Sequence, residues 1–149
     1  MGTDQQAELK ELEEEFSREI QGEGSLMPTV DGTHVGFDIH PEDIDVLFFD
    51  GIGVPRYASI EIEDLDQKNA TYMERYNAAM AEFPLIGRAN DTMVGASYSA
   101  SEVTKLVAEC NALIGRSIDE KAARAVKKLL IAAMKAEAGN APLTLSPRM

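Results

Sequence analysis

Histidine and carboxylate side chains gather between residues 34 and 45, and these residue types can bind a metal ion. His34, Asp38 and His40 alternate with apolar residues, as they would on one face of a strand, and acids follow at positions 42, 43 and 45. The distance along an extended strand from His34 to His40 is about 20 Å, whereas metal ligands lie about 2 Å from one centre. We therefore expect a solvated strand face, and a metal-dependent enzyme that uses the carboxylates of residues 38–50 stays an alternative.

Two further residues have types that could act as nucleophiles. Asp50 follows an apolar run and precedes Gly51, but the second acid that phosphoryl-transfer chemistry requires two residues later is Ile52. Cys110 lies in an apolar helical stripe, which predicts a buried thiol, and a single cysteine cannot form an internal disulfide. The sequence also lacks a glycine-rich phosphate loop and an H-E-x-x-H or C-x-x-C motif. It predicts a non-catalytic protein that needs no cofactor or metal.

The charged residues are distributed unevenly along the chain. Residues 1–66 hold eighteen of the twenty-six acids and three of the fourteen bases, whereas residues 67–149 hold eight acids and eleven bases. A strongly negative surface attracts basic partners and repels nucleic acid and anionic membranes. We therefore expect a basic protein as the partner, with no direct contact to nucleic acid or membrane.

The N-terminal segment has the pattern of an acidic helix. Its apolar side chains recur at helical spacing: Leu9, Leu12, Phe16 and Ile20. Thr3 and Gln6 predict a capping box at its start, and Gly22 and Gly24 predict its end. Glutamates occupy most positions between the apolar residues, so this helix carries much of the negative charge.

The next segment predicts β-structure. Asp31-Gly32 is a strong hairpin signal, because both central residues of such a turn take positive φ angles. The predicted strands are 26–30, 33–39, a continuous apolar strand at 44–49, and an alternating strand at 57–63.

The basic half predicts mainly helices. A helix is expected from residue 65 to 83 with a stripe of Leu65, Met73, Tyr76, Met80 and Phe83, followed by a short strand at 92–97. Two further helices begin at predicted capping boxes, Ser99 with Glu102 and Ser117 with Glu120. Their apolar stripes are Val103, Leu106, Val107, Cys110 and Leu113 in the first, and Ala122, Val126, Leu129, Leu130 and Ala133 in the second. Lys121, Arg124 and Lys128 are expected opposite the second stripe, and residues 143–149 are a short strand.

Together these elements predict one α+β domain over residues 1–149. Its mostly antiparallel sheet of four to five strands would pack against an N-terminal helix, a middle helix and a C-terminal helix pair. The longest apolar run, 129–134, is too short for a membrane span, and no signal peptide is recognisable, so we expect a soluble cytoplasmic protein.

A family resemblance is carried by residues 83–145. The matching residues are Phe83-Pro84-Leu85-Ile86-Gly87-Arg88, Asp91-Thr92, Tyr98, Glu102-Val103, Glu109 and Leu143-Thr144-Leu145. This stretch resembles the C-terminal half of small bacterial immunity-type proteins that accompany polymorphic toxins. The resemblance implies an inhibitor that binds and blocks a partner and has no catalytic residues.

Partner binding is expected at an acidic face with tyrosine anchors. The candidate residues are Glu11, Glu14, Glu15, Asp38, Asp43, Asp45, Tyr57, Glu61 and Glu63, with Tyr72 as a second aromatic candidate. A nuclease-type toxin or a DNA-binding protein has the basic surface that such a face would fit. The other alternative is a structural subunit of a phage or bacterial assembly, homo- or hetero-oligomeric, in which the acidic and basic halves of neighbours pair.

Overall fold

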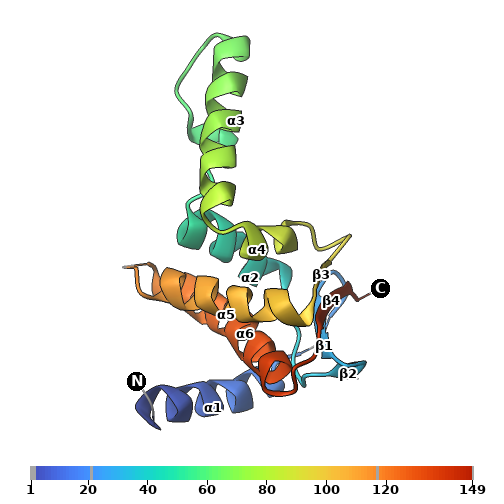
Figure 1. Cartoon of the computed structure of the whole chain (residues 1–149). Coiled ribbons are helices and arrows are strands. Elements are labelled where there is room, and N and C mark those ends of the chain that lie inside the picture. The colour runs from blue at the N-terminus through green and yellow to red at the C-terminus, as the bar shows by residue number, and fades with distance from the viewer. Residues whose placement is uncertain (1–2, 21, 117, 149) are drawn as a thin grey trace.

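The protein has an α+β fold in which one antiparallel sheet packs beside a group of helices (Figure 1). The computed structural model describes residues 3–20, 22–116 and 118–148. The helices are α1 (Thr3–Ser17), α2 (Pro41–Val46), α3 (Leu65–Glu82), α4 (Pro84–Gly87), α5 (Ala100–Ile114) and α6 (Glu120–Ala138). The strands are β1 (Leu26–Val30), β2 (Thr33–His34), β3 (Ala96–Tyr98) and β4 (Leu143–Pro147). The predicted fold class is therefore confirmed.

The sheet has the strand order β2-β1-β4-β3, and every neighbouring pair is antiparallel. The predicted hairpin is confirmed: Asp31 and Gly32 have φ angles of 52° and 82°, as the tight turn between β1 and β2 requires. The second strand of this hairpin ends at His34, much earlier than the predicted residue 39, although Ile39 returns to form a bridge with Leu26. The strand expected at 92–97 begins later, at Ala96.

Helix α6 is the centre of the core. The residues of its predicted stripe are all buried, and it packs against α5, α2 and β1. Helix α5 begins at the predicted capping box, in which Ser99 and Glu102 each accept the other's backbone N–H. Leu106 and Cys110 on α5 are fully buried. Asp119 caps α6, and the cap predicted at residue 117 lies outside the described residues.

The central strand predicted at 44–49 is wrong, because this segment is helical. Helix α2 is followed directly by a π-helix, Leu47–Ile52. Pro41 occupies the first turn of α2, where its fixed φ favours a helix, and the Asp43 carboxylate accepts the backbone N–H of His40. A short apolar run is compatible with a buried strand or a buried helix, and here the buried positions 44, 47, 48 and 52 follow a helical period.

The strand predicted at 57–63 is also wrong. Residues Tyr57–Ser59 form a single 3₁₀ turn, and the following residues are extended without pairing to the sheet. The alternation predicts that Ala58, Ile60 and Ile62 face inward, but only Ile60 is buried, whereas Ile62 is partly buried and Ala58 is exposed. This segment runs beside α3, where Tyr57 contacts Asn69 and Tyr72.

Helix α1 is shorter than its apolar pattern predicts. It ends at Ser17, so Ile20 lies beyond it and is 89% exposed. Leu9 and Phe16 are buried against the rest of the protein, and Leu12 is partly buried. Three of the four predicted stripe positions therefore face the core.

Helix α3 projects away from the other elements (Figure 1). The predicted helix is confirmed, but none of the residues of α3 is buried, and Leu65 and Met73 are 67% and 49% exposed. Residues 53–64 run beside α3, and we call residues 53–82 the arm and the remaining described residues the body. Helix α3 ends before Pro84, and the buried Phe83 brings the chain back to the body.

Within the described residues, no helix combines the length and the apolar content that crossing a membrane requires.

Candidate protein-binding surface

Part of the acidic charge on α1 is neutralised within the molecule by α6. The Lys127 Nζ lies 2.7 Å from Glu8 Oε1, and the Lys135 Nζ lies 2.7 Å from Glu13 Oε2. The two charged halves of the sequence therefore meet inside one molecule, where the acids contribute to holding α1 on α6.

The three glutamates predicted on α1 differ in their surroundings. Glu15 lies 3.6 Å from Arg124 NH2, a long contact between two exposed side chains. Glu11 and Glu14 are exposed and have no ion pair within residues 3–20, 22–116 and 118–148. Among the described residues, Glu11 and Glu14 are therefore the two acids of the predicted α1 set that form no ion pair.

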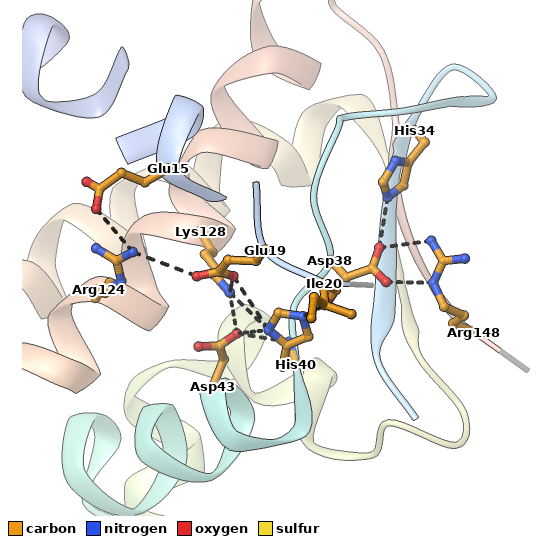
Figure 2. Close-up of polar contacts among 10 residues, drawn as sticks. All are labelled: Glu15, Glu19, Ile20, His34, Asp38, His40, Asp43, Arg124, Lys128 and Arg148. Carbon is orange, nitrogen blue, oxygen red and sulfur yellow. Dashed lines mark hydrogen bonds and ion pairs between the residues drawn. The ribbon is translucent and has the colours of Figure 1, made fainter. Parts of the chain in front are cut away.

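A second cluster is built around Lys128, which is 2% exposed at its side chain (Figure 2). Its Nζ lies 2.5 Å from Glu19 Oε1 and 2.6 Å from Asp43 Oδ2, and the ring of Phe16 is 5.1 Å from it. The prediction that Lys128 faces outward with Lys121 is therefore wrong. Buried ammonium groups require such partners, because desolvation disfavours an unpaired charge.

The His40 ring closes this cluster. The ring Nε2 is 2.9 Å from the Ile20 carbonyl oxygen, which can only accept, so Nε2 carries the proton. The ring Nδ1 lies 3.4 Å from the Lys128 Nζ and 3.5 Å from a carboxylate oxygen of each of Glu19 and Asp43. Lys128 thus donates to Glu19 and Asp43 and contacts His40, and the cluster joins the segment after α1, α2 and α6. Asp43, a predicted partner residue, is therefore engaged within the molecule.

Asp38 is held in a third cluster (Figure 2). Arg148 binds both carboxylate oxygens, at 2.6 and 3.1 Å, and His34 Nε2 lies 2.9 Å from Oδ1. Burial raises the pKa of Asp38, but the hydrogen bonds from Arg148 and His34 outweigh burial and hold the pKa below its usual 3.8. Asp38 is 2% exposed, so its carboxylate ties the β4 end to the segment before α2 and does not lie on the surface.

The histidines and acids of residues 34–45 do not converge. His34 lies with Asp38, whereas His40 lies in the Lys128 cluster. In the part of the chain that the structure describes, no group of three His, Cys, Asp or Glu side chains is placed to hold a metal ion. Cys110 is fully buried, as predicted, and burial raises the pKa of its thiol.

The end of the arm combines an exposed leucine with exposed acids. We call residues 61–66 the arm tip. Leu65 is 67% exposed, and Glu61, Glu63 and Asp66 are exposed on either side of it in sequence. Asp64 caps α3 by accepting the backbone N–H groups of Asp66 and Gln67, at 3.0 and 3.4 Å. The cap fixes where the helix begins and so holds Leu65 at the tip.

Three of the four tyrosines lie along one side of the arm. The rings of Tyr57 and Tyr72 are 5.5 Å apart, and those of Tyr72 and Tyr76 are 5.9 Å apart. The Tyr57 hydroxyl donates to Asn69 Oδ1 at 2.6 Å, and the Lys68 ammonium lies 4.5 Å from the same ring. Tyrosines of this kind offer large rigid contact areas at protein interfaces.

The predicted site residues do not form one face. Helix α1, with Glu11 and Glu14, lies at the opposite end of the molecule from the arm, with Glu61 and Glu63 (Figure 1). Asp45 is exposed near the junction of arm and body. Sequence analysis missed Leu65 as a surface residue, because its place in an apolar helical stripe is typical of a core residue.

The chain matches no protein-family model, and comparison with curated proteins and with solved structures gives no match either.

Proposed function

We propose that the protein is a non-catalytic binding protein whose arm docks on a basic partner protein. The observation that carries this proposal is the arm tip, where Leu65 is 67% exposed and the exposed acids Glu61, Glu63 and Asp66 lie within four residues of it in the sequence. An exposed apolar side chain with charged residues next to it has the composition of an apolar contact with a polar rim, as protein interfaces have.

The charge of the arm favours a basic partner. Residues 53–82 contain six acids and three bases, and the acids concentrate at the tip. A basic surface would be steered to the tip by long-range attraction, and Leu65 would then be desolvated in an apolar pocket of that surface.

A different protein fits this role better than a second copy of the chain. The cations of α6 that face α1, including Lys127, Lys128 and Lys135, already contact carboxylates of their own molecule. The exposed cations that form no ion pair among the described residues, such as Lys10, Lys105 and Lys121, lie on three separate helices, and the net charge of −12 makes two copies of the chain repel each other. An inhibitor of immunity type, bound to a nuclease-type toxin or to a DNA-binding protein, is the most specific form of the proposal. In that form the arm acids would occupy a site that otherwise binds phosphate.

The proposal is tested by placing a photo-crosslinking amino acid at Leu65 and, as a control, at the exposed Ala112 on α5 of the body. The proteins captured in source cells are identified, and a protein crosslinked from Leu65 alone is purified for binding measurements. We expect this protein to be basic. An acidic protein, a second copy of the chain, or equal capture from both positions would contradict the proposal.

Two matched charge variants then separate the arm from α1. Glu61→Gln with Glu63→Gln should lower the association rate of the purified partner about three- to tenfold at low ionic strength, and less at high salt. Glu11→Gln with Glu14→Gln removes the same charge at the other end of the molecule and should change this rate little. An equal effect of both pairs would show that net charge, and not the arm, governs binding.

A further inference from the structure

A small cavity lies at the root of the arm, where α3 meets α2 and the π-helix. Its volume is about 200 Å³, and four of its eight lining residues are aromatic: Phe48, Phe49, Tyr72 and Tyr76. Asp45 also lines it and supplies a carboxylate. Pockets for cofactors and drug-sized ligands usually have volumes of ~300–1,000 Å³, so this root pocket has the size for a single side chain.

The aromatic walls favour a cation. The face of an aromatic ring is negative, and guanidinium groups stack on it well because they are planar and weakly hydrated. The structure contains one such pair at this wall: the Arg56 guanidinium carbon lies 4.0 Å from the centre of the Phe49 ring. Within the described part of the chain, no lysine or arginine lies over the rings of Tyr72 or Tyr76.

The Asp45 carboxylate adds a negative charge to the pocket, and within the described residues it is not neutralised by an ion pair. It is exposed, and no ion pair of Asp45 occurs among the described residues. Asp38 and Asp43, its neighbours in sequence, are both bound to cations of the same chain. The root pocket therefore joins two half-buried tyrosine side chains to an open carboxylate, which is the arrangement that a cationic side chain requires.

The wall on the arm side is held in place by polar contacts. The Asn90 side chain, which also lines the pocket, donates to the Tyr76 hydroxyl at 3.0 Å. The return of the arm to the body is fixed by Glu109, whose carboxylate accepts the backbone N–H groups of Leu85 and Ile86 at 3.0–3.2 Å. The pocket is thus formed before a ligand arrives, which lowers the entropic cost of binding.

We propose that the root pocket receives an arginine side chain of the basic partner, with its guanidinium against Tyr72 or Tyr76 and paired with Asp45. This inference rests on the proposed function and extends it, because it gives the arm a second contact point that recognises one residue type. The arm tip attracts a basic surface in general, whereas the root pocket selects an arginine that protrudes from it.

The probe is Nα-acetyl-L-arginine amide, and its neutral control is Nα-acetyl-L-citrulline amide, which has nearly the same shape without the charge. Binding to the full chain is followed by the NMR resonances of the tyrosine and phenylalanine rings. We expect the arginine amide to shift the resonances of Tyr72 and Tyr76 in a saturable manner. Equal shifts with the citrulline amide, or shifts confined to residues outside the root pocket, would overturn the inference.

A matched pair of variants tests the carboxylate. Asp45→Asn should lower the affinity for the arginine amide about two- to fivefold, which corresponds to the energy of an exposed charge pair. Asp50→Asn removes the same charge from an exposed residue that does not line the pocket and should leave the affinity unchanged. Both variants are compared with the parent protein by their thermal unfolding, and an unchanged affinity in a folded Asp45→Asn variant would overturn the inference.

Failure of the inference and failure of the proposed function give different results. If Leu65 crosslinks a basic protein but the arginine amide does not bind, the arm docks without the root pocket. If the arginine amide binds in the pocket but Leu65 crosslinks no basic protein, the pocket is a cation site and the proposed function is wrong.

Discussion

The ring of Tyr57 meets the ring of Tyr72 nearly edge to face, with centroids 5.5 Å apart and an angle of 78° between the planes. This contact joins the segment before α3 to α3 itself. Ile60 is 5% exposed close to the same contact in sequence, although it is not part of the main core. The arm therefore has a small packing unit of its own, and its local stability is separable from that of the body.

The first prediction concerns this packing unit. Ile60→Ala should loosen the arm while the body stays folded, because Ile60 lies in the arm, is buried, and does not belong to the main core. Hydrogen exchange should become faster across residues 57–82 and stay unchanged in α6. The free energy of global unfolding should change by less than about 1 kcal/mol. Faster exchange in α6 would show that arm and body unfold together.

The second prediction compares two leucines. Leu106 is fully buried in α5, so Leu106→Ala should lower the free energy of unfolding by about 2–5 kcal/mol. Leu65→Ala at the arm tip should change it by no more than about 0.5 kcal/mol. The Leu65→Ala variant should nevertheless bind more weakly to the protein that is crosslinked from position 65. Urea unfolding gives both stabilities, and a large loss in Leu65→Ala would mean that this side chain is packed in the free protein.

The third prediction concerns the buried ammonium group. Lys128→Met keeps much of the apolar stem but leaves Glu19 and Asp43 facing each other without a cation. We expect the free energy of unfolding to fall by about 3 kcal/mol. This is the lower end of the range for breaking a buried ion pair, because both carboxylates are partly exposed. Lys121→Met on the exposed side of the same helix should cost less than about 0.5 kcal/mol. Equal effects of the two variants would contradict the Lys128 cluster.

The fourth prediction concerns acid. The folded-state pKa of Asp38 is lowered below 3.8, so its contribution to stability is complete above the unfolded pKa and is lost as pH falls through the folded pKa. Asp38→Asn should therefore be clearly less stable than the parent at neutral pH, and the difference should shrink below pH 3.8. Asp31→Asn in the exposed hairpin turn is the matched control. Urea unfolding between about pH 7 and pH 2 measures the trend, and a constant difference would mean that the Asp38 charge is not involved.

Local signals in the sequence predicted a large part of the fold. The Asp31-Gly32 turn and the Ser99–Glu102 cap depend on residues close in sequence, and both are confirmed. The apolar run at 44–49 was misassigned because its helical form depends on Pro41 and on burial against α6, which a short run does not reveal. The period of the pattern is ambiguous over so few residues.

The candidate surface was less predictable. The partners of Lys128, Glu19 and Asp43, lie 109 and 85 positions away in sequence, so no local pattern shows that the lysine is buried. Charge counting found the acidic half but could not tell carboxylates that pair internally from those at the arm tip. The stripe on α3 resembles that of a packed helix, and only the three-dimensional arrangement shows that the helix projects.

The order of strands in the sheet has a consequence for how the protein is made. Strand β4 lies between β1 and β3, yet it is synthesised after helices α1 to α6. Before β4 has been translated, the only neighbouring strand with which β1 can pair in this sheet is β2. A two-stranded hairpin alone is only marginally stable. The edge of β1 that β4 later covers stays open to other nascent chains during this time. The sheet can close only after residue 147 has left the ribosomal exit tunnel.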